Sequence, residues 1–156
     1  MISLKDFIGQ SKSSNLSYAV LRNWHQPTPS WTEFDNLKQL DSGRISLKGK
    51  PYGDIFKLFL DQSIEAYPDI AYEFFLMEAS SYRNLDPAQS GTYQHTDPHD
   101  VIHWQCRGAT EWFMGDDMKP ILLEPGDLIW FAANTKHKTE NITEKYALIF
   151  NAGKLL

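Results

Sequence analysis

The stretch GTYQHTDPHDVIHWQCRG, residues 91–108, places three histidines and two aspartates between positions 95 and 103, inside a run of β-branched and aromatic residues. Such residues favour strands, whereas aspartate and proline between them are typical of turns. The stretch therefore predicts two short strands, 92–97 and 101–107, and it concentrates candidate metal ligands where they meet.

The same pattern of strand-forming residues separated by turn residues continues to residue 152. Short extended segments alternate with Gly, Pro, Asp and Asn turn signals. Strands at such regular spacing favour a sandwich or a barrel. The predicted strands are 92–97, 101–107, 110–115, 119–124, 127–132, 136–141 and 146–152.

Residues 1–90 are mixed in character. Apolar residues recur at helical spacing in 53–67, and Ser30 followed by Glu33 is typical of a helix N-terminus. No linker is long enough to divide the chain, so we expect one domain over 1–156, with 1–90 as an elaboration of a barrel core at 91–152. Helices are predicted at 4–10, 30–40 and 53–67, and strands at 17–24 and 71–79.

The composition is that of an ordinary folded protein, with 42% hydrophobic and 22% charged residues. The 15 basic and 20 acidic residues are scattered, which does not favour a nucleic-acid partner. The single cysteine, Cys106, cannot form an internal disulfide and is typical of a reducing compartment. Without a signal-like segment or a long apolar run, the sequence predicts a cytoplasmic protein that does not span a membrane.

His95 and Asp97 are the first candidate metal ligands. Side chains two positions apart on a strand point to the same face, so both would be presented to one point inside a barrel. His137 follows an apolar strand, and on an antiparallel neighbour it would approach this pair. Two histidines and one carboxylate are the ligands of non-haem Fe(II) oxygenases. We expect His103 to face the cavity without ligating, and we interpret His99 as a turn residue.

Each candidate ligand also has a purely structural interpretation. A His-x-Asp pair such as 95–97 occurs often by chance, and a single histidine such as His137 is usually a surface or hydrogen-bonded residue. The metal hypothesis therefore depends on the surrounding motifs.

The segment around His137 resembles a known motif. Residues 126–141 read Gly, five residues, Ala, one residue, Asn, two residues, His, three residues and Asn. This is similar to the second motif of the cupin superfamily, with Ala132 and Asn134 where that motif usually has Pro and Gly. The segment LLEPGDLIWF, 122–131, is similar to the one before the distal histidine in the JmjC and hydroxylase branch. The resemblance implies a mainly β fold with N-terminal helices, the double-stranded β-helix of the cupin or jelly-roll type.

The first motif departs from that of the four-ligand cupins. In these proteins His-x-His is followed by Glu, whereas here Asp97 replaces the second histidine, and Val101 and Ile102 stand where the Glu is expected. A His-x-Asp motif is similar to that of the JmjC-like Fe(II) and 2-oxoglutarate oxygenases. The resemblance implies a hydroxylase-type oxygenase in which His95, Asp97 and His137 are the catalytic metal ligands of Fe(II) and 2-oxoglutarate is the cosubstrate.

The resemblance also implies contacts with the cosubstrate. Thr92 matches a threonine that binds the distal carboxylate of 2-oxoglutarate in related hydroxylases. Gln105 matches a strand position that faces the cosubstrate, and Asn151 resembles an asparagine near its C1 carboxylate.

The family's lysine for the distal carboxylate is missing, because Thr110 occupies its position. A dicarboxylate in a dry cavity needs a cationic partner, since an unpaired buried charge is heavily penalised. Lys145 is the first candidate for this cation, and Arg107, expected on the same face as His103 and Gln105, is the second.

Two other functions stay open because Thr110 weakens the 2-oxoglutarate assignment. One is a cupin metalloenzyme whose small substrate binds the metal directly, as in small-molecule dioxygenases. The other is a non-catalytic, ligand-binding cupin. Under the leading hypothesis the partner is a small-molecule or peptide substrate, and a homodimer is compatible with the resemblance.

Overall fold

The computed structural model describes residues 1–153 except 31, 34–43, 48–52 and 79–91. All seven strands expected between residues 92 and 152 are present, which confirms a mainly β fold. The helices are α1 (Leu4–Ser13) and α3 (Asp54–Ala66), and the strands are β1 (Tyr18–Leu21), β2 (Arg44–Ser46), β3 (Tyr72–Glu78), β4 (Thr92–His95), β5 (Asp100–Arg107), β6 (Thr110–Met114), β7 (Lys119–Leu123), β8 (Leu128–Phe131), β9 (His137–Asn141) and β10 (Tyr146–Ala152).

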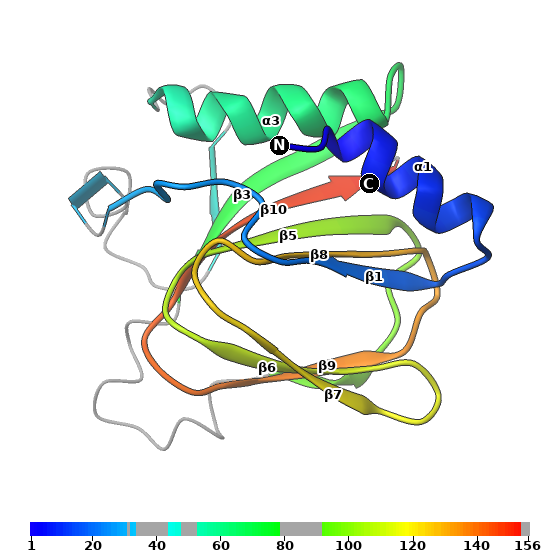
Figure 1. The fold of residues 1–156 in the computed structure, drawn as a ribbon. Coiled ribbons are helices and arrows are strands. Elements are labelled where there is room, and N and C mark those ends of the chain that lie inside the picture. The colour runs from blue at the N-terminus through cyan, green and yellow to red at the C-terminus, as the bar shows by residue number, and fades with distance from the viewer. Residues whose placement is uncertain (31, 34–43, 48–52, 79–91, 154–156) are drawn as a thin grey trace.

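The strands form two antiparallel sheets. The six-stranded sheet has the order β1-β8-β5-β10-β3-β2, and the four-stranded sheet has the order β4-β9-β6-β7. The two sheets face each other, and α1 and α3 cover the outer face of the larger one (Figure 1). Consecutive strands therefore alternate between the sheets in part of the chain, as β8, β9 and β10 do, and residues distant in sequence meet in the space between them.

The helices begin where the sequence carries capping residues. Ser3 is the N-cap of α1 and its Oγ accepts a hydrogen bond from the Asp6 amide at 3.1 Å. Ser30 accepts from the Glu33 amide at 3.1 Å, as expected for the predicted helix at 30–40, but residues 31 and 34–40 of that helix lie outside the described residues. Among the helices that the structure describes, none combines the length and the apolar character that a bilayer crossing requires.

Alternation along each strand creates two separate cores. On β5, Ile102 and Trp104 belong to a cluster that packs against the helices, whereas Val101 belongs to a second cluster between the sheets. His103 and Gln105 share the parity of Val101 and are buried, so polar side chains enter the space between the sheets. We call this space the barrel interior.

Candidate metal centre

His95 and His137 face each other across two strands. They are register partners on the antiparallel strands β4 and β9, and their ring centroids are 4.2 Å apart. An irregularity between Thr92 and His95 shifts the register just before this pair. A bulge changes the direction of the side chains that follow it. This irregularity is therefore the local backbone feature that accompanies the close approach of the two imidazoles.

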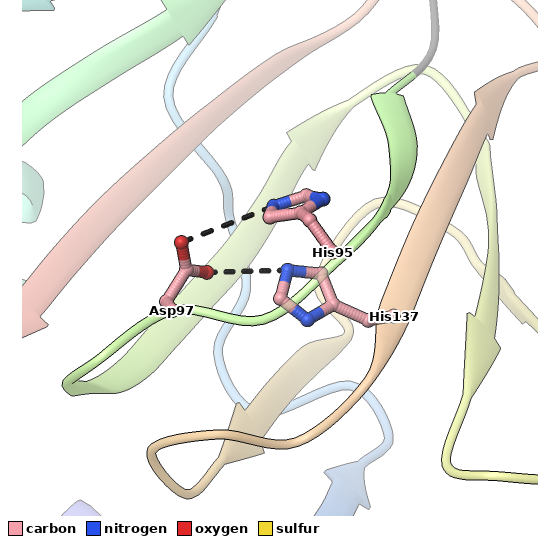
Figure 2. Close-up of side chains that lie close together, drawn as sticks. All are labelled: His95, Asp97 and His137. Atoms are coloured by element: carbon pink, nitrogen blue, oxygen red, sulfur yellow. Dashed lines mark ion pairs between the residues drawn. The ribbon is translucent and has the colours of Figure 1, made fainter.

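The carboxylate of Asp97 faces both histidines. Its Oδ2 is 3.2 Å from His137 Nε2, and its Oδ1 is 3.9 Å from His95 Nε2. Figure 2 shows each carboxylate oxygen directed at one ring. One donor atom from each residue lies within 4.8 Å of the others, which makes these residues a group able to hold a metal ion.

The second nitrogen of each ring is occupied by the backbone. His95 Nδ1 lies 2.5 Å from the Tyr93 carbonyl oxygen, and His137 Nδ1 lies 2.8 Å from the Thr135 carbonyl oxygen. A carbonyl can only accept, so each Nδ1 donates its proton there. Such a bond fixes the tautomer and the ring orientation of a metal-binding histidine and leaves Nε2 for the metal. Both Nε2 atoms face Asp97.

Asp97 carries the negative charge of the group. The hydrogen bond with His137 lowers the pKa of its carboxyl below the usual range, and partial burial opposes this effect. The ionised carboxylate is the form that ligates a cation. A metal ion at this point would lie where His137 Nε2 and the carboxylate oxygen approach each other at 3.2 Å.

The sequence placed His95 and Asp97 on one continuous strand, and the structure corrects this detail. Strand β4 ends at His95, and Asp97 lies in the segment that turns into β5. The backbone carbonyl of Asp97 accepts a hydrogen bond from the Asn134 amide at 2.7 Å. Tertiary contact, rather than strand periodicity, therefore holds the carboxylate beside the imidazoles.

Gln105 lies in the barrel interior with every polar atom of its amide engaged. Its Nε2 donates toward the carbonyls of Arg107 at 3.2 Å and Gly108 at 3.1 Å and toward Thr110 Oγ1 at 3.2 Å. The amide oxygen must then face His103 Nε2, 2.9 Å away, so that this nitrogen donates. Gln105 thus organises the β5–β6 turn, and Thr110 is one of its partners.

Lys145 is buried at the other end of the interior, just before β10. Burial lowers its pKa to about 8, and no carboxylate among the described residues forms an ion pair with it. Burial and the nearby Lys145 together lower the pKa of His103 to about 3, so His103 stays neutral. As expected, His103 is not part of the metal-binding group.

Arg107, the second candidate cation, is held elsewhere. Its Nε donates to the Pro29 carbonyl at 2.8 Å, in the segment that follows β1. The reason lies in the register: the pairing of β5 with β10 shifts between Tyr146 and Ala147, next to Arg107. The alternation of side chains along β5 is therefore interrupted before its last residue, Arg107.

The other two predicted cosubstrate residues are placed as follows. Asn151 is buried on β10 opposite Val101, near the end of β5 that leads to Asp97. Thr92 pairs with Thr139 through the backbone, while its side chain lies outside the described part of the chain. The roles of Thr92, Gln105, Lys145 and Asn151 stay predictions.

The comparison with known proteins gives a clear result for the fold alone. No protein-family model and no curated relative matches the chain. Among solved structures, Escherichia coli YcfD is similar with a TM-score of 0.67 and 14% identity, over 100% of this chain and 54% of that one. A cupin superfamily protein from Desulfitobacterium hafniense is similar with a TM-score of 0.51 and 14% identity, over 86% of this chain and 98% of that one. The chain has the cupin fold.

A further structure of YcfD, described as a ribosomal oxygenase in complex with cobalt and succinic acid, is similar with a TM-score of 0.61 and 15% identity. The match covers 48% of the YcfD chain, so this chain spans about half the length of YcfD. The double-stranded β-helix expected from the motif around His137 is thus confirmed, and the structural neighbours include a protein described as a ribosomal oxygenase.

One polar group in this cupin fold escaped the sequence analysis. Trp112 lies in the interior between His103, at 4.8 Å between ring centroids, and His137, at 6.0 Å. Its buried Nε1 has no hydrogen-bond partner among the residues that the structure describes. Trp112 has the same parity as Thr110 along β6, and this places its indole inside the barrel. From the sequence alone, however, an aromatic residue at such a position is ordinarily interpreted as part of the core.

Proposed function

We propose that the protein is an Fe(II)- and 2-oxoglutarate-dependent oxygenase of the hydroxylase type. The observation that carries the proposal is the convergence of His95, Asp97 and His137, with both Nδ1 atoms bonded to carbonyls and both Nε2 atoms facing the carboxylate. Two imidazoles and one carboxylate suit Fe(II) and leave coordination positions for other ligands. With 2-oxoglutarate and oxygen, bound Fe(II) would supply oxidative decarboxylation and hydroxylation of a substrate.

The interior residues support a dicarboxylate as the second ligand. Lys145 would offer a buried ammonium to the distal carboxylate, because a buried cation is strongly stabilised by an anion. The unpartnered Trp112 Nε1 would offer a hydrogen bond in the same interior. The complex of YcfD with cobalt and succinic acid supports the proposal, since that protein combines a metal with a dicarboxylate.

Aromatic side chains would shield the reacting centre. Phe131 lies 4.4 Å from His137 between ring centroids, and Trp112 stacks on the same imidazole at 6.0 Å. Both are buried. In a site closed on this side, electrostatic interactions with Asp97 are stronger than in water and unwanted reactions with solvent are limited. His95 and Asp97 are partly exposed, so a substrate would approach from their side.

The decisive experiment is an anaerobic titration. Fe(II) and 2-oxoglutarate together are expected to give the weak visible charge-transfer band of the metal chelate, and admission of oxygen should yield succinate. Lys145→Met is expected to raise the half-saturating 2-oxoglutarate concentration by about tenfold or more, given the 1.4 kcal/mol that a tenfold change represents. Lys119→Met, at an exposed lysine of β7, is the matched control and should leave it unchanged.

A second function is favoured by one specific observation. Thr110, at the position where related hydroxylases carry the lysine, is buried and accepts a hydrogen bond from Gln105. A cupin metalloprotein that binds a small substrate directly on the metal, or binds a ligand without turnover, would need no cation there. This alternative is accepted if Fe(II) binds and 2-oxoglutarate gives neither the band nor succinate. The substrate of the oxygenase is proposed to be a small molecule or a peptide side chain.

A further inference from the structure

Asp100, the first residue of β5, joins three separate parts of the chain. Its Oδ1 accepts the amide of Ala133 at 2.8 Å. Its Oδ2 accepts the hydroxyl of Tyr67 at 2.7 Å and lies 3.3 Å from Lys12 Nζ. Tyr67 ends α3 and Lys12 lies in the last turn of α1, so the carboxylate connects both helices to the turn between β8 and β9.

The contact with Tyr67 has a defined direction. Trp130 Nε1 donates to the Tyr67 hydroxyl oxygen at 2.7 Å, and indole can only donate. The hydroxyl proton is therefore free to point at Asp100. Burial and the neighbouring carboxylate raise the pKa of Tyr67, which keeps this proton in place. Trp130, Tyr67 and Asp100 thus form a chain of donors that ends on the carboxylate.

The turn that Asp100 holds carries two contacts to the candidate metal ligands. Asn134, next to Ala133, donates its amide to the Asp97 carbonyl at 2.7 Å. Thr135 presents its carbonyl to His137 Nδ1 at 2.8 Å. Asn134 has a φ of 65°, a left-handed conformation that needs support from its surroundings. A displaced turn would therefore move Asp97 and rotate His137 together.

We infer that Asp100 is a positioning residue of the metal centre: it holds the turn before β9 so that Asp97 and His137 present their ligand atoms to one point. Asp100 itself is outside the metal-binding group. Both helices contact this carboxylate, since Lys12 and Tyr67 both lie against Oδ2. The inference rests on the proposed function only in requiring that the site binds a divalent metal.

The test is a titration of the metal-free protein with Co(II), followed by the visible absorption of the bound ion. Asp100→Ala is expected to weaken Co(II) binding by about 10–100-fold, the usual effect of removing a residue that orients a ligand. Asp100→Asn keeps an oxygen at the Oδ1 position for the Ala133 amide and should stay within about threefold of wild type. Asp100→Glu keeps the charge but moves the acceptor by one methylene, and it should lose affinity like the alanine variant.

The asparagine and glutamate variants separate geometry from charge, and they keep the inference testable if Asp100→Ala does not fold. Tyr67→Phe is the control for general stability: it removes one donor to Oδ2, leaves the Ala133 contact, and should lower the melting temperature without weakening Co(II) binding. Wild-type protein that fails to bind Co(II) would overturn the proposed function. Wild-type protein that binds, with Asp100→Ala and Asp100→Glu binding equally well, would overturn the role of Asp100.

Discussion

His95 and His137 are directly opposed register partners whose imidazole centroids are 4.2 Å apart, with the Asp97 carboxylate against both Nε2 atoms. Two backbone carbonyls hold the rings in this orientation before any ion is bound. A preformed arrangement lowers the entropic cost of binding, since little side-chain freedom remains to be lost. The candidate metal centre is therefore expected to bind a metal ion without rearrangement of the barrel.

Replacing Asp97 by Asn should abolish tight metal binding while the fold persists. The variant removes the only negative charge of the group, and its side chain is about the same size and 30% exposed. We expect the affinity for Co(II) or Fe(II) to fall by more than about 100-fold, beyond the usual effect of residues that only orient ligands. Metal-dependent thermal stabilisation checks this, because a saturating ligand stabilises by about 2.7 kcal/mol at 100 times its dissociation constant.

A histidine variant serves as control for that experiment. His25 is half-buried and packs against Trp104, a residue of the core next to the helices, with 6.2 Å between ring centroids. His25→Ala should lower the melting temperature and keep the metal-dependent increase. Asp97→Asn protein that retains this increase would contradict the assignment of Asp97 as a ligand.

The metal-free protein should become more stable as the pH rises above neutrality, because the buried Lys145 then loses its proton. Burial lowers its folded pKa to about 8 from 10.5. Below pH 8 both states are protonated and the buried charge destabilises the fold. Between about pH 8 and 10.5 the unfolded chain binds more protons, so the free energy of unfolding rises with pH. The full difference is on the order of 3 kcal/mol, at 1.36 kcal/mol per pKa unit.

Urea unfolding of wild type and Lys145→Met at several pH values isolates this contribution. The variant should be the more stable protein at pH 7, and its advantage should shrink toward pH 10.5 as wild-type Lys145 loses its proton. Lys5→Met, at an exposed position of α1, should follow wild type at every pH. An advantage of Lys145→Met that is constant with pH would show that the ammonium is not destabilised by burial.

Local sequence patterns predicted the strands between residues 92 and 152 and singled out His95 and His137, because side-chain alternation and turn residues are features of consecutive positions. They could not predict how the strands pair. Trp104 and Trp112 are similar in sequence terms, yet Trp104 lies on the outer face of the larger sheet and packs against the helices, whereas Trp112 lies on the inner face of the smaller sheet and enters the barrel. Arg107 was expected to face inward by parity, and the register shift opposite it directs its Nε to Pro29. Asp97 leaves the strand and is placed by the amide of Asn134, a contact between distant segments.

Gln105 should be far more important for stability than a single amide usually is. Gln105→Leu keeps the volume of the side chain but leaves the carbonyls of Arg107 and Gly108, and the proton of His103 Nε2, without their partner. Each buried polar group left unsatisfied costs about 1–3 kcal/mol. We expect the free energy of unfolding to fall by about 2–5 kcal/mol in urea titrations. A loss below about 1 kcal/mol would mean that water or other groups replace the amide.

Gly108 and Gly9 provide a matched pair of glycine-to-alanine substitutions with opposite expected signs. Gly108 has a φ of +71°, and a Cβ there would lie 1.7 Å from the carbonyl oxygen of Glu144. The left-handed conformation costs an L-residue about 1–2 kcal/mol, and forced overpacking adds about 1–3 kcal/mol. Because Glu144 precedes Lys145, relief of this clash must shift the lysine. Gly108→Ala should therefore lower both the stability and the affinity for 2-oxoglutarate, while Co(II) binding at His95 and His137 persists.

Gly9 lies inside α1, and no neighbouring atom of the described residues comes within 4 Å of the position of an added Cβ. Alanine is a better helix former than glycine by about 0.8–1.0 kcal/mol, so Gly9→Ala should raise the free energy of unfolding by about that amount. Urea unfolding at one pH, with cosubstrate titrations on the same preparations, checks both variants. If Gly108→Ala were as stable as Gly9→Ala, the β5–β6 turn would not be packed against the segment before β10, and its link to Lys145 would have to be abandoned.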